Sequence, residues 1–600
     1  MTKKKYIIIS VVIILISIIA LIGASYALLT LTVEGDKKIT LTAGILKVDF
    51  SEGDTINLDN TAPMTNNQGL KTTPYTFTIT NTGNINAYYH VSLEEDSNNT
   101  LDNSYLKMRI TGSNGYDSGV VRVSNYGKGT FEIIGEDTLE PGEDVTYELR
   151  MWLDENAGNE AQGKIHQSKI VVESFDREQN SPNAPVLDNG MIPVTYNGTN
   201  WIKADVTNTN NDWYNYNEQK WANAVTVSSS TRDTYKNASN GTVVNMDDIE
   251  TMWVWIPRYS YSIGSEDGTN YYGKQGEYLD TTPTQALPGE IDIKFVSENK
   301  KDRGTAKYIV SDGIQDNSWY TPDAFTFGDE ELRGIWVGKF ETSSSNPSAE
   351  YGGGYATELD AMIKPNVPSW RFINVSNAFN VSLKMNDDGN RYGIENTTDT
   401  HMMKNSEWAI VSYLSQSKYG KLGNTNFSGA NKEIYQNKSN SFVTGCSYGA
   451  PSDADEVYGC QYTYDIDKRG TGASTTGSIY GIYDMSGGSW EYVMGNYNDI
   501  VASSGFSDPL TLDRKYYNKY TSDNSSIACD ESECLSHTLS ETVGWYNDYS
   551  TMANETYPWL LRGGGYSSWS VAGIFNFDCS TTAIGGSLSS GSFRLVAAIK

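Results

Sequence analysis

The sequence has little cysteine, histidine and positive charge for its length, and each shortage argues against a class of protein. Its 600 residues include five Cys and four scattered His, with no CxxC pair. This disfavours both a disulfide framework and a zinc site. Lys and Arg number 45 against 74 Asp and Glu, a net charge of -29. Nucleic-acid binding requires a basic surface, so the charge balance disfavours that function.

Recognisable enzyme signatures are also missing. The chain contains no HExxH, Walker or Rossmann motif, so the common metalloprotease and nucleotide-binding sites have no support. What is abundant is aromatic: 41 Tyr and 14 Trp bring the aromatic share to 12%. Rigid rings offer large contact areas at small entropic cost, which suits recognition. Most of the tyrosines, however, are expected to fill half-buried strand positions.

The few cysteines suggest local bridges. Cys446 with Cys460, and Cys529 with Cys534, are close enough in sequence to pair in an oxidising compartment. Cys579 is then left over. The length of the chain predicts two to four domains.

The N-terminus has the features of an export signal. Three lysines at positions 3–5 precede an almost unbroken apolar run over residues 6–22, and Ser25 and Ala27 follow as small residues. This predicts a signal at residues 1–27, either cleaved after Ala27 or retained as a membrane anchor. The rest of the chain is then extracellular, and is either held at the cell surface or secreted.

Residues 28–177 alternate apolar and polar side chains in short runs, as in residues 75–80 (YTFTIT) and 145–153 (VTYELRMWL). Period-two alternation broken by Gly, Asn and Pro predicts an antiparallel β-sandwich. The stretch is weakly similar to camelysin-type surface proteins, which implies a spacer or stalk.

Residues 178–250 are predicted to be a linker followed by a small β-rich lead-in, either an independent module or a segment that packs on the last domain. Residues 251–600 alternate short strands with long Gly/Ser/Asn loops. Helical periodicity is confined to residues 376–385 and 403–414. The fold class is therefore mixed: an all-β sandwich followed by an α+β domain rich in irregular loops.

Four sequence blocks within residues 251–600 resemble the sulfatase-modifying-factor family, whose founding member is the formylglycine-generating enzyme. In order they are residues 333–342 (RGIWVGKFET), 400–409 (THMMKNSEWA), 478–492 (SIYGIYDMSGGSWEY), and the pair LRGGG at 561–565 with GSFRLV at 591–596. The resemblance implies that residues 251–600 form that family's variety of the C-type lectin fold, with a first strand at 253–259.

The third block implies a calcium site, because family members bind this ion there. By position, the side-chain ligands are Asp484 and Glu491, and the carbonyl ligands are Met485, Gly487 and Ser489. Calcium takes six to eight oxygen ligands, and carbonyls at a tight glycine turn supply neutral ones. The alternative is that the Gly pair is only a turn and Glu491 only a solvated or capping residue.

The family's oxidase chemistry is not expected here. Its oxidising enzymes carry two Cys after the RGG motif, and this chain has Ser568 and Gly573 at those positions. Neither side chain binds Cu(I) or exchanges a disulfide. We therefore predict a protein without catalytic residues.

The tail also resembles the variable proteins of diversity-generating retroelements. The fixed points are RGGGY (562–566), AGIFNF (572–577) and SFR (592–594). The resemblance implies a display of ligand-binding residues within and between them: Tyr566, Ser567, Ser568, Trp569, Ser570, Asn576, Asp578, Ser580, Thr581, Thr582 and Ser587. Small hydroxyls beside one large aromatic suit adaptable recognition; an ordinary polar loop is the alternative.

These features predict a surface-displayed, non-catalytic adhesin or receptor whose C-terminal tip binds a protein or glycan, with calcium as a structural ion. Its other contact is the membrane, through the N-terminal segment if that is uncleaved. A structural envelope or fibre protein without a specific ligand is the rival interpretation.

Overall fold

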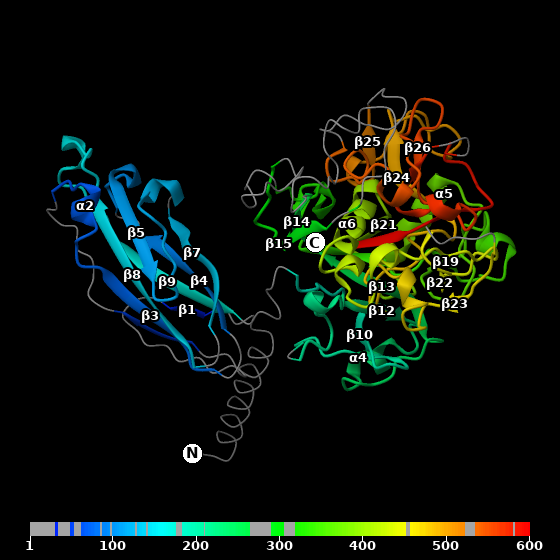
Figure 1. Ribbon diagram of the computed structural model, residues 1–600, viewed down its shortest axis with the longest axis horizontal. Helices are drawn as coiled ribbons and strands as arrows, with labels where there is room; N and C mark the ends of the chain where they lie inside the picture. Colours follow the sequence, from blue (N-terminus) through cyan, green and yellow to red (C-terminus); the bar gives the residue numbers. More distant parts are fainter. Residues whose placement is uncertain are drawn as a thin grey trace, which may run out of the picture. The chain divides into compact units, whose positions relative to one another are not determined.

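The computed structural model divides the chain into two compact units, Met1–Ser181 and Pro182–Lys600 (Figure 1). The residues described are 31–33, 48–52, 62–83, 87–96, 99–126, 129–139, 142–175, 183–208, 210–263, 288, 290–304, 319–451, 457–521, 534–579 and 583–599. The predicted export signal at residues 1–27 lies outside them. Within the described ranges, no helix has the length and apolar character needed to cross a membrane.

The first unit contains two antiparallel sheets that share one hydrophobic core. One sheet orders β1 (Leu31–Val33), β9 (Ser168–Phe175), β4 (Ala87–Glu95) and β7 (Thr130–Leu139). The other orders β2 (Val48–Glu52), β3 (Tyr75–Asn81), β8 (Asp144–Leu153), β5 (Leu106–Gly112) and β6 (Val121–Arg122). Burial alternates along β3, as expected for a strand with one face on a core. This is the two-layer β arrangement that the alternation predicts.

The second unit is built around a seven-stranded antiparallel sheet. Its order is β11 (Trp201–Lys203), β10 (Ile192–Tyr196), β12 (Asn223–Val227), β13 (Ile249–Pro257), β18 (Gly334–Gly338), β29 (Leu595–Ile599) and β21 (Thr398–Met402). The first three strands come from the segment predicted to be a linker and lead-in. They share the sheet and its core with the rest of the unit. The observed unit therefore starts near residue 182, not 251.

A second sheet carries the C-terminal motifs. It orders β25 (Asn518–Tyr520), β24 (Trp490–Tyr497), β26 (Trp559–Gly563) and β27 (Gly573–Asp578), and β28 (Gly591–Phe593) also pairs with β24. The two predicted helices are present as α5 (Val375–Leu383) and α6 (Asn405–Ser415). Helix α6 packs against β24 and is buried along its whole length.

Most of the remaining second unit is irregular. Its paired short strands are β14 (Tyr259–Ile263) with β15 (Ile291–Phe295), β16 (Thr326–Phe327) with β17 (Glu330–Glu331), β19 (Ser343–Ser344) with β20 (Ala361–Met362), and β22 (Cys446–Ser447) with β23 (Tyr462–Thr463). Short helices occur at α2 (Asn66–Gly69) in the first unit and α4 (Arg232–Asn237) in the second. The chain is thus mixed and β-rich, with loops that carry much of its surface.

Candidate ligand-binding site

The predicted ligand-binding residues lie in the loops around β27. Trp569 is 45% exposed, and Ser567 and Ser570 are also exposed. Tyr566, Ser568 and Ser587 are half-buried. Ser580, Thr581 and Thr582 lie outside the described residues, so their place in the face stays a prediction.

Asn576 and Asp578 need a correction, because both lie on β27 and are buried. The Asn576 side-chain amide donates a hydrogen bond of 2.7 Å to the carbonyl of Val571. All six residues of β27 are buried, so the period-two rule for a half-exposed strand does not apply. Asn576 therefore supports the loop from below, and neither side chain is presented to a large ligand.

Two aromatic residues that were not identified from the sequence complete the exposed surface. The Trp569 indole N–H donates to the hydroxyl of Tyr458 at 3.0 Å. The Tyr458 ring packs edge-on against Tyr566 at 5.5 Å, and Tyr566 packs edge-on against Phe442 at 5.1 Å. We call Phe442, Tyr458, Tyr566 and Trp569 the aromatic face.

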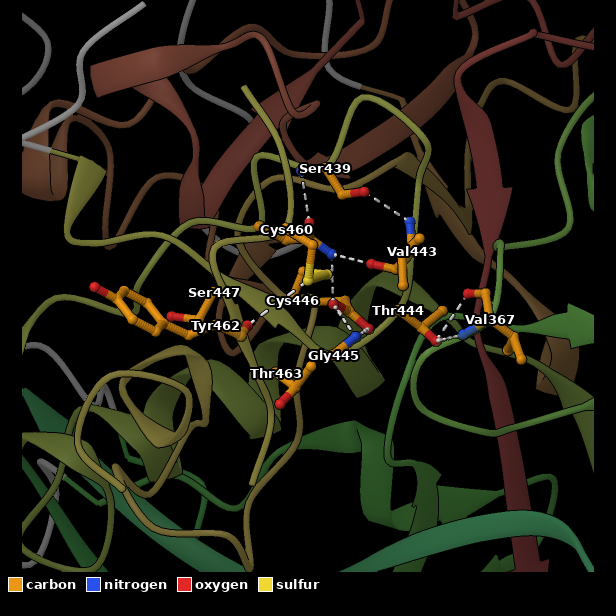
Figure 2. The surroundings of a disulfide bond; sticks show 12 residues. Val367, Ser439, Val443, Thr444, Gly445, Cys446, Ser447, Cys460, Tyr462 and Thr463 are labelled. Atoms are coloured by element: carbon orange, nitrogen blue, oxygen red, sulfur yellow. Dashed lines mark hydrogen bonds between the residues drawn. A yellow bond between two sulfur atoms is a disulfide. The ribbon is translucent and has the colours of Figure 1, made fainter. Parts of the chain in front are cut away.

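A disulfide holds the segment that carries Tyr458. Cys446 and Cys460 are bonded, which confirms the predicted pair. Figure 2 shows this bridge beside Ser439 and Val443, whose backbone N–H donates to the Ser439 hydroxyl at 3.1 Å. A cross-link so close to Tyr458 limits the conformations of its loop, which lowers the entropic cost of binding.

The other cysteines are only partly accounted for. Cys579 is free and buried, as expected. Cys529 lies outside the described residues, so its pairing with Cys534 stays a prediction.

Part of the aromatic face has an unfavourable backbone conformation. Trp569 has a φ of 49° and Phe442 a φ of 57°, in the left-handed region that bulky side chains rarely adopt. The surrounding backbone holds these loops: Tyr566 N–H donates to the Gly488 carbonyl at 2.8 Å, and Ser369 N–H donates to that of Phe442 at 2.9 Å. Strained residues cluster at ligand sites because the scaffold imposes their geometry.

The predicted calcium segment contacts this face through the hydrogen bond from the Tyr566 N–H to the Gly488 carbonyl, and its predicted ligands are buried. Both oxygens of the Asp484 carboxylate accept hydrogen bonds from the Gly445 N–H, at 2.9 and 3.0 Å, and one also accepts from the Asn437 amide at 2.9 Å. Glu491 makes a two-point ion pair with Arg594, with N–O distances of 2.5 and 2.9 Å. The sequence thus brings both predicted carboxylates into one region, and each has a protein partner there.

A third carboxylate, Glu341, joins this region and was not predicted as a site residue. Its Oε1 accepts a hydrogen bond of 2.8 Å from the Ser489 N–H. Burial and repulsion from Asp484 and Glu491 raise the pKa of Glu341 well above its usual range. Burial also raises the pKa of Glu491 to about 7, even though Arg594 opposes this shift. Arg594 therefore faces three buried acids, with Arg371 also attracted by Glu341, and a further positive charge would stabilise their ionised forms.

The donors in this segment are of the type that calcium prefers. Among the described residues we find no hydrogen bond to the carbonyl oxygens of Met485, Gly487 or Ser489. A carboxylate has about four lone-pair positions, so Glu491 can accept from Arg594 and still bind an ion. No group of three His, Cys, Asp or Glu in the described part of the chain is arranged to hold a metal ion. A calcium ion here would therefore depend on the carbonyls.

The two positions that carry Cys in the oxidase family have other roles here. The Ser568 hydroxyl accepts a hydrogen bond of 2.9 Å from the Gly565 N–H. At Gly573, an added Cβ would lie 2.1 Å from both carboxylate oxygens of Asp548. Asp548 in turn accepts a hydrogen bond from the Phe575 N–H at 2.9 Å, and its burial raises its pKa well above the usual range. A thiol at position 573 would require this buried carboxyl to move.

The RGG motif itself is structural. Arg562 is fully buried, and its guanidinium donates to Asn405 Oδ1 at 2.7 Å and to the His537 carbonyl at 2.8 Å. Gly563 and Gly564 have φ values of 81° and 74°, which favour glycine. This fixed turn leads β26 into the loop that carries Tyr566 and Trp569. No protein-family model and no curated protein matches this chain.

Proposed function

We propose that this chain is an exported ligand-binding protein of the cell surface, comparable to an adhesin or receptor. Its second unit takes the formylglycine-generating-enzyme variety of the C-type lectin fold and uses it without catalysis. The first unit serves as a spacer. The N-terminal segment directs export and, where it is not cleaved, anchors the protein in the membrane.

The aromatic face is the observation that supports binding best. It holds two large side chains that are 45% exposed (Trp569) and 39% exposed (Tyr458), joined by a hydrogen bond. Exposed aromatics with a polar edge are enriched where proteins bind partners, because they gain contact area while losing few rotamers. The disulfide and the imposed backbone conformation fix the face before a ligand arrives.

A non-catalytic role agrees with the contacts at Ser568 and Gly573. Redox chemistry through this site requires thiolate sulfur. The Asp548 carboxyl occupies the space into which a side chain at Gly573 would extend. Burial also raises the pKa of Asp548 well above its usual range, which disfavours the charged form of this carboxyl beside the loop.

Calcium belongs to the proposal as a structural ion. Asp484 and Glu491 would hold it with the carbonyls of Met485, Gly487 and Ser489. The Gly488 carbonyl of the same turn accepts the Tyr566 N–H. An ion at this turn would therefore stiffen the base of the aromatic face.

The test is binding of the full chain to a glycan array and a protein array, followed by Trp569→Ala. We expect this variant to weaken any detected interaction at least about tenfold, as hot-spot aromatics do. Val243→Ala is the control, because Val243 is an apolar side chain that is 47% exposed, as Trp569 nearly is, but lies outside the aromatic face. Val243 forms a β-bridge with Ile202 of β11. A ligand that binds wild type and Trp569→Ala equally would place its site elsewhere. A chain that binds nothing on either array would favour the structural envelope or fibre protein.

A further inference from the structure

The aromatic face continues into a longer surface that reaches residues outside the tail. The Arg371 guanidinium lies over the Phe442 ring at 3.8 Å and over the Tyr351 ring at 5.6 Å. Tyr351 stacks on Phe372 at 4.5 Å, and Phe372 contacts Tyr355 at 4.8 Å. Together with the aromatic face these residues form what we call the aromatic strip: Tyr351, Tyr355, Arg371, Phe372, Phe442, Tyr458, Tyr566 and Trp569.

The added half of the strip is also exposed and conformationally fixed. Tyr355 is 59% exposed, and Arg371 and Phe372 are half-buried. Tyr351 and Phe372 have φ values of 55° and 60°. Backbone hydrogen bonds hold both segments: Arg371 N–H donates to the Tyr351 carbonyl at 2.8 Å, and Phe372 N–H to that of Leu588 at 2.9 Å. Of the five aromatic residues with positive φ in the described ranges, four belong to the strip.

Arg371 gives the strip a positive charge, and the acidic group that attracts it is the buried Glu341. In the described part of the chain its guanidinium makes no ion pair, whereas it donates to the Ser589 carbonyl. Its Nε is buried without a hydrogen-bond acceptor. Most other arginines described here are ion-paired, as expected in a chain with 74 acidic and 45 basic residues. An unpaired guanidinium stacked between rings is suited to an anionic group on a ligand.

We infer that the aromatic strip binds an acidic carbohydrate chain, whose sugar rings stack on the aromatic rings and whose carboxylate or sulfate contacts Arg371. The inference rests on the proposed binding function and adds the chemical class of its ligand. Sugars present apolar C–H faces to rings and hydroxyls to their surroundings. Ser567, Ser570 and Ser589 are exposed near the strip and supply hydrogen-bonding partners for those hydroxyls.

Other ligand classes fit these observations less well. A peptide that adds to a sheet needs a free strand edge, and one that binds as a helix needs an apolar groove. The strip instead lies in turns and loops, between the strands of the second unit. Single-stranded nucleic acid also stacks on aromatic rings, but it needs a basic groove, and the net charge is -29.

The test uses the purified full chain and calorimetric titration with three probes: oligogalacturonate, its methyl ester and a heparin-derived oligosaccharide. The methyl ester keeps the sugar and removes the charge. We expect oligogalacturonate or the heparin fragment to bind. Oligogalacturonate carries carboxylates alone and heparin carries carboxylates and sulfates, so binding of oligogalacturonate would show that a carboxylate suffices, and binding of the heparin fragment alone would indicate sulfate. The methyl ester should bind at least roughly tenfold more weakly, which is the usual effect of losing a hydrogen bond to a charged group.

Arg371→Gln should weaken binding of the acidic probe by a similar factor and leave the methyl ester unchanged. Arg371→Lys, which keeps the charge and loses the planar fork, should fall between the two. Arg469→Gln is the matched control, because Arg469 also lies over a tyrosine, Tyr462 at 5.2 Å, outside the strip. Unchanged thermal unfolding of each variant will exclude misfolding as the cause.

Three outcomes would overturn the inference. The first is that the acidic and esterified sugars bind with equal affinity, and the second is that Arg371→Gln does not change the affinity for the acidic probe. The third is that the arrays yield only polypeptide ligands. In the third case, loss of polypeptide binding in Trp569→Ala would leave the proposed binding function standing with a different ligand class. If Trp569→Ala affects no ligand at all, the proposed function itself is wrong.

Discussion

Two regions in direct contact, the buried segment 484–491 and the exposed aromatic strip, use opposite means to stay in place. The first contains Asp484 and Glu491 and contacts Glu341, and the fully buried side chain of Arg594 forms an ion pair with Glu491. The second holds aromatic rings and the half-buried guanidinium of Arg371. A buried charge that loses its partner stays out of contact with water, which destabilises the folded state, whereas an exposed ring is already solvated. Substitutions in the segment should therefore affect stability, and substitutions in the strip should affect binding.

The largest predicted effect comes from breaking the ion pair between Arg594 and Glu491. Arg594 also donates to the carbonyls of Gly338 and Tyr483, at 2.8 and 3.0 Å, so it ties β18 to the segment. Arg594→Met should lower the free energy of unfolding by about 3–5 kcal/mol, because it leaves buried carboxylates uncompensated. Denaturant unfolding of the full chain, followed by tryptophan fluorescence, measures this loss.

The control for Arg594→Met is an exposed pair in the same unit. Arg303 contacts Asp323 at 2.6 Å, and their side chains are 39% and 52% exposed. Arg303→Met should cost less than about 1 kcal/mol. Equal losses in the two variants would contradict the contrast between a buried and an exposed charge.

A buried histidine near the end of β21, with a carboxylate on each ring nitrogen, predicts a pH dependence of stability. His401 is fully buried, and its two ring nitrogens lie 2.9 Å from Asp399 and 3.0 Å from Glu407. Burial disfavours the imidazolium, but these carboxylates outweigh it and raise the pKa of His401 to about 9. Because the folded pKa is raised, the stabilisation is complete below the unfolded value of about 6.5 and disappears as pH rises towards 9.

The free energy of unfolding should accordingly fall by about 3 kcal/mol between pH 6.5 and 9. Urea titrations at a series of pH values measure this change. His401→Gln should flatten the profile over that window, since the titrating group is gone. The prediction would be wrong if the free energy of unfolding of the wild type did not change between pH 6.5 and 9. It would also be wrong if His401→Gln lost as much stability as the wild type over that range.

The sequence predicts these two regions to different degrees, for a physical reason. Residues 484–491 are contiguous, so one motif identifies Asp484 and Glu491 together. The bridge between Cys446 and Cys460 is likewise predictable, because only 14 positions separate the two cysteines. Arg594 lies 103 positions from Glu491, and Tyr458 lies 111 from Trp569. Contacts between residues so far apart depend on how the loops are arranged in space, and the loops have no sequence periodicity from which that arrangement could be predicted.

The dependence on spatial arrangement also explains why the position of some strands and the burial of others could not be predicted from the sequence. From the sequence, the lead-in strands β10–β12 could be an independent module or a segment packed on the last domain; in the structure they complete a seven-stranded sheet. Asn576 and Asp578 were predicted to be displayed for a ligand, but they lie on a strand in which every residue is buried. Alternation predicts strands with one exposed face well. It fails for β13 and β27, where every residue is buried.

Calcium should affect stability less than the loss of Arg594 or of the charge on His401, and it tests how the two regions are coupled. Adding calcium to chelator-treated protein should raise the free energy of unfolding by about 2.7 kcal/mol at a concentration 100 times the Kd. Differential scanning calorimetry will show this as a higher Tm, and magnesium, which gives up its water reluctantly, should have less effect. Glu491→Gln should reduce the calcium shift. A Tm that is the same with chelator and with millimolar calcium would remove the ion from the proposal.

The pH dependence of the calcium effect sharpens this test. Burial raises the pKa of Glu491 to about 7, so the folded state binds its proton more tightly than the unfolded state does. In chelator, this group therefore costs stability progressively as pH rises from about 4.5 to about 7. Calcium compensates the same charge, so its stabilising effect should be larger at pH 7.5 than at pH 5. It should also restore part of the stability lost in Arg594→Met, because both cations neutralise one cluster of carboxylates. A calcium shift independent of pH would instead place the ion away from Glu491, and the buried segment would then support the aromatic strip through its ion pair alone.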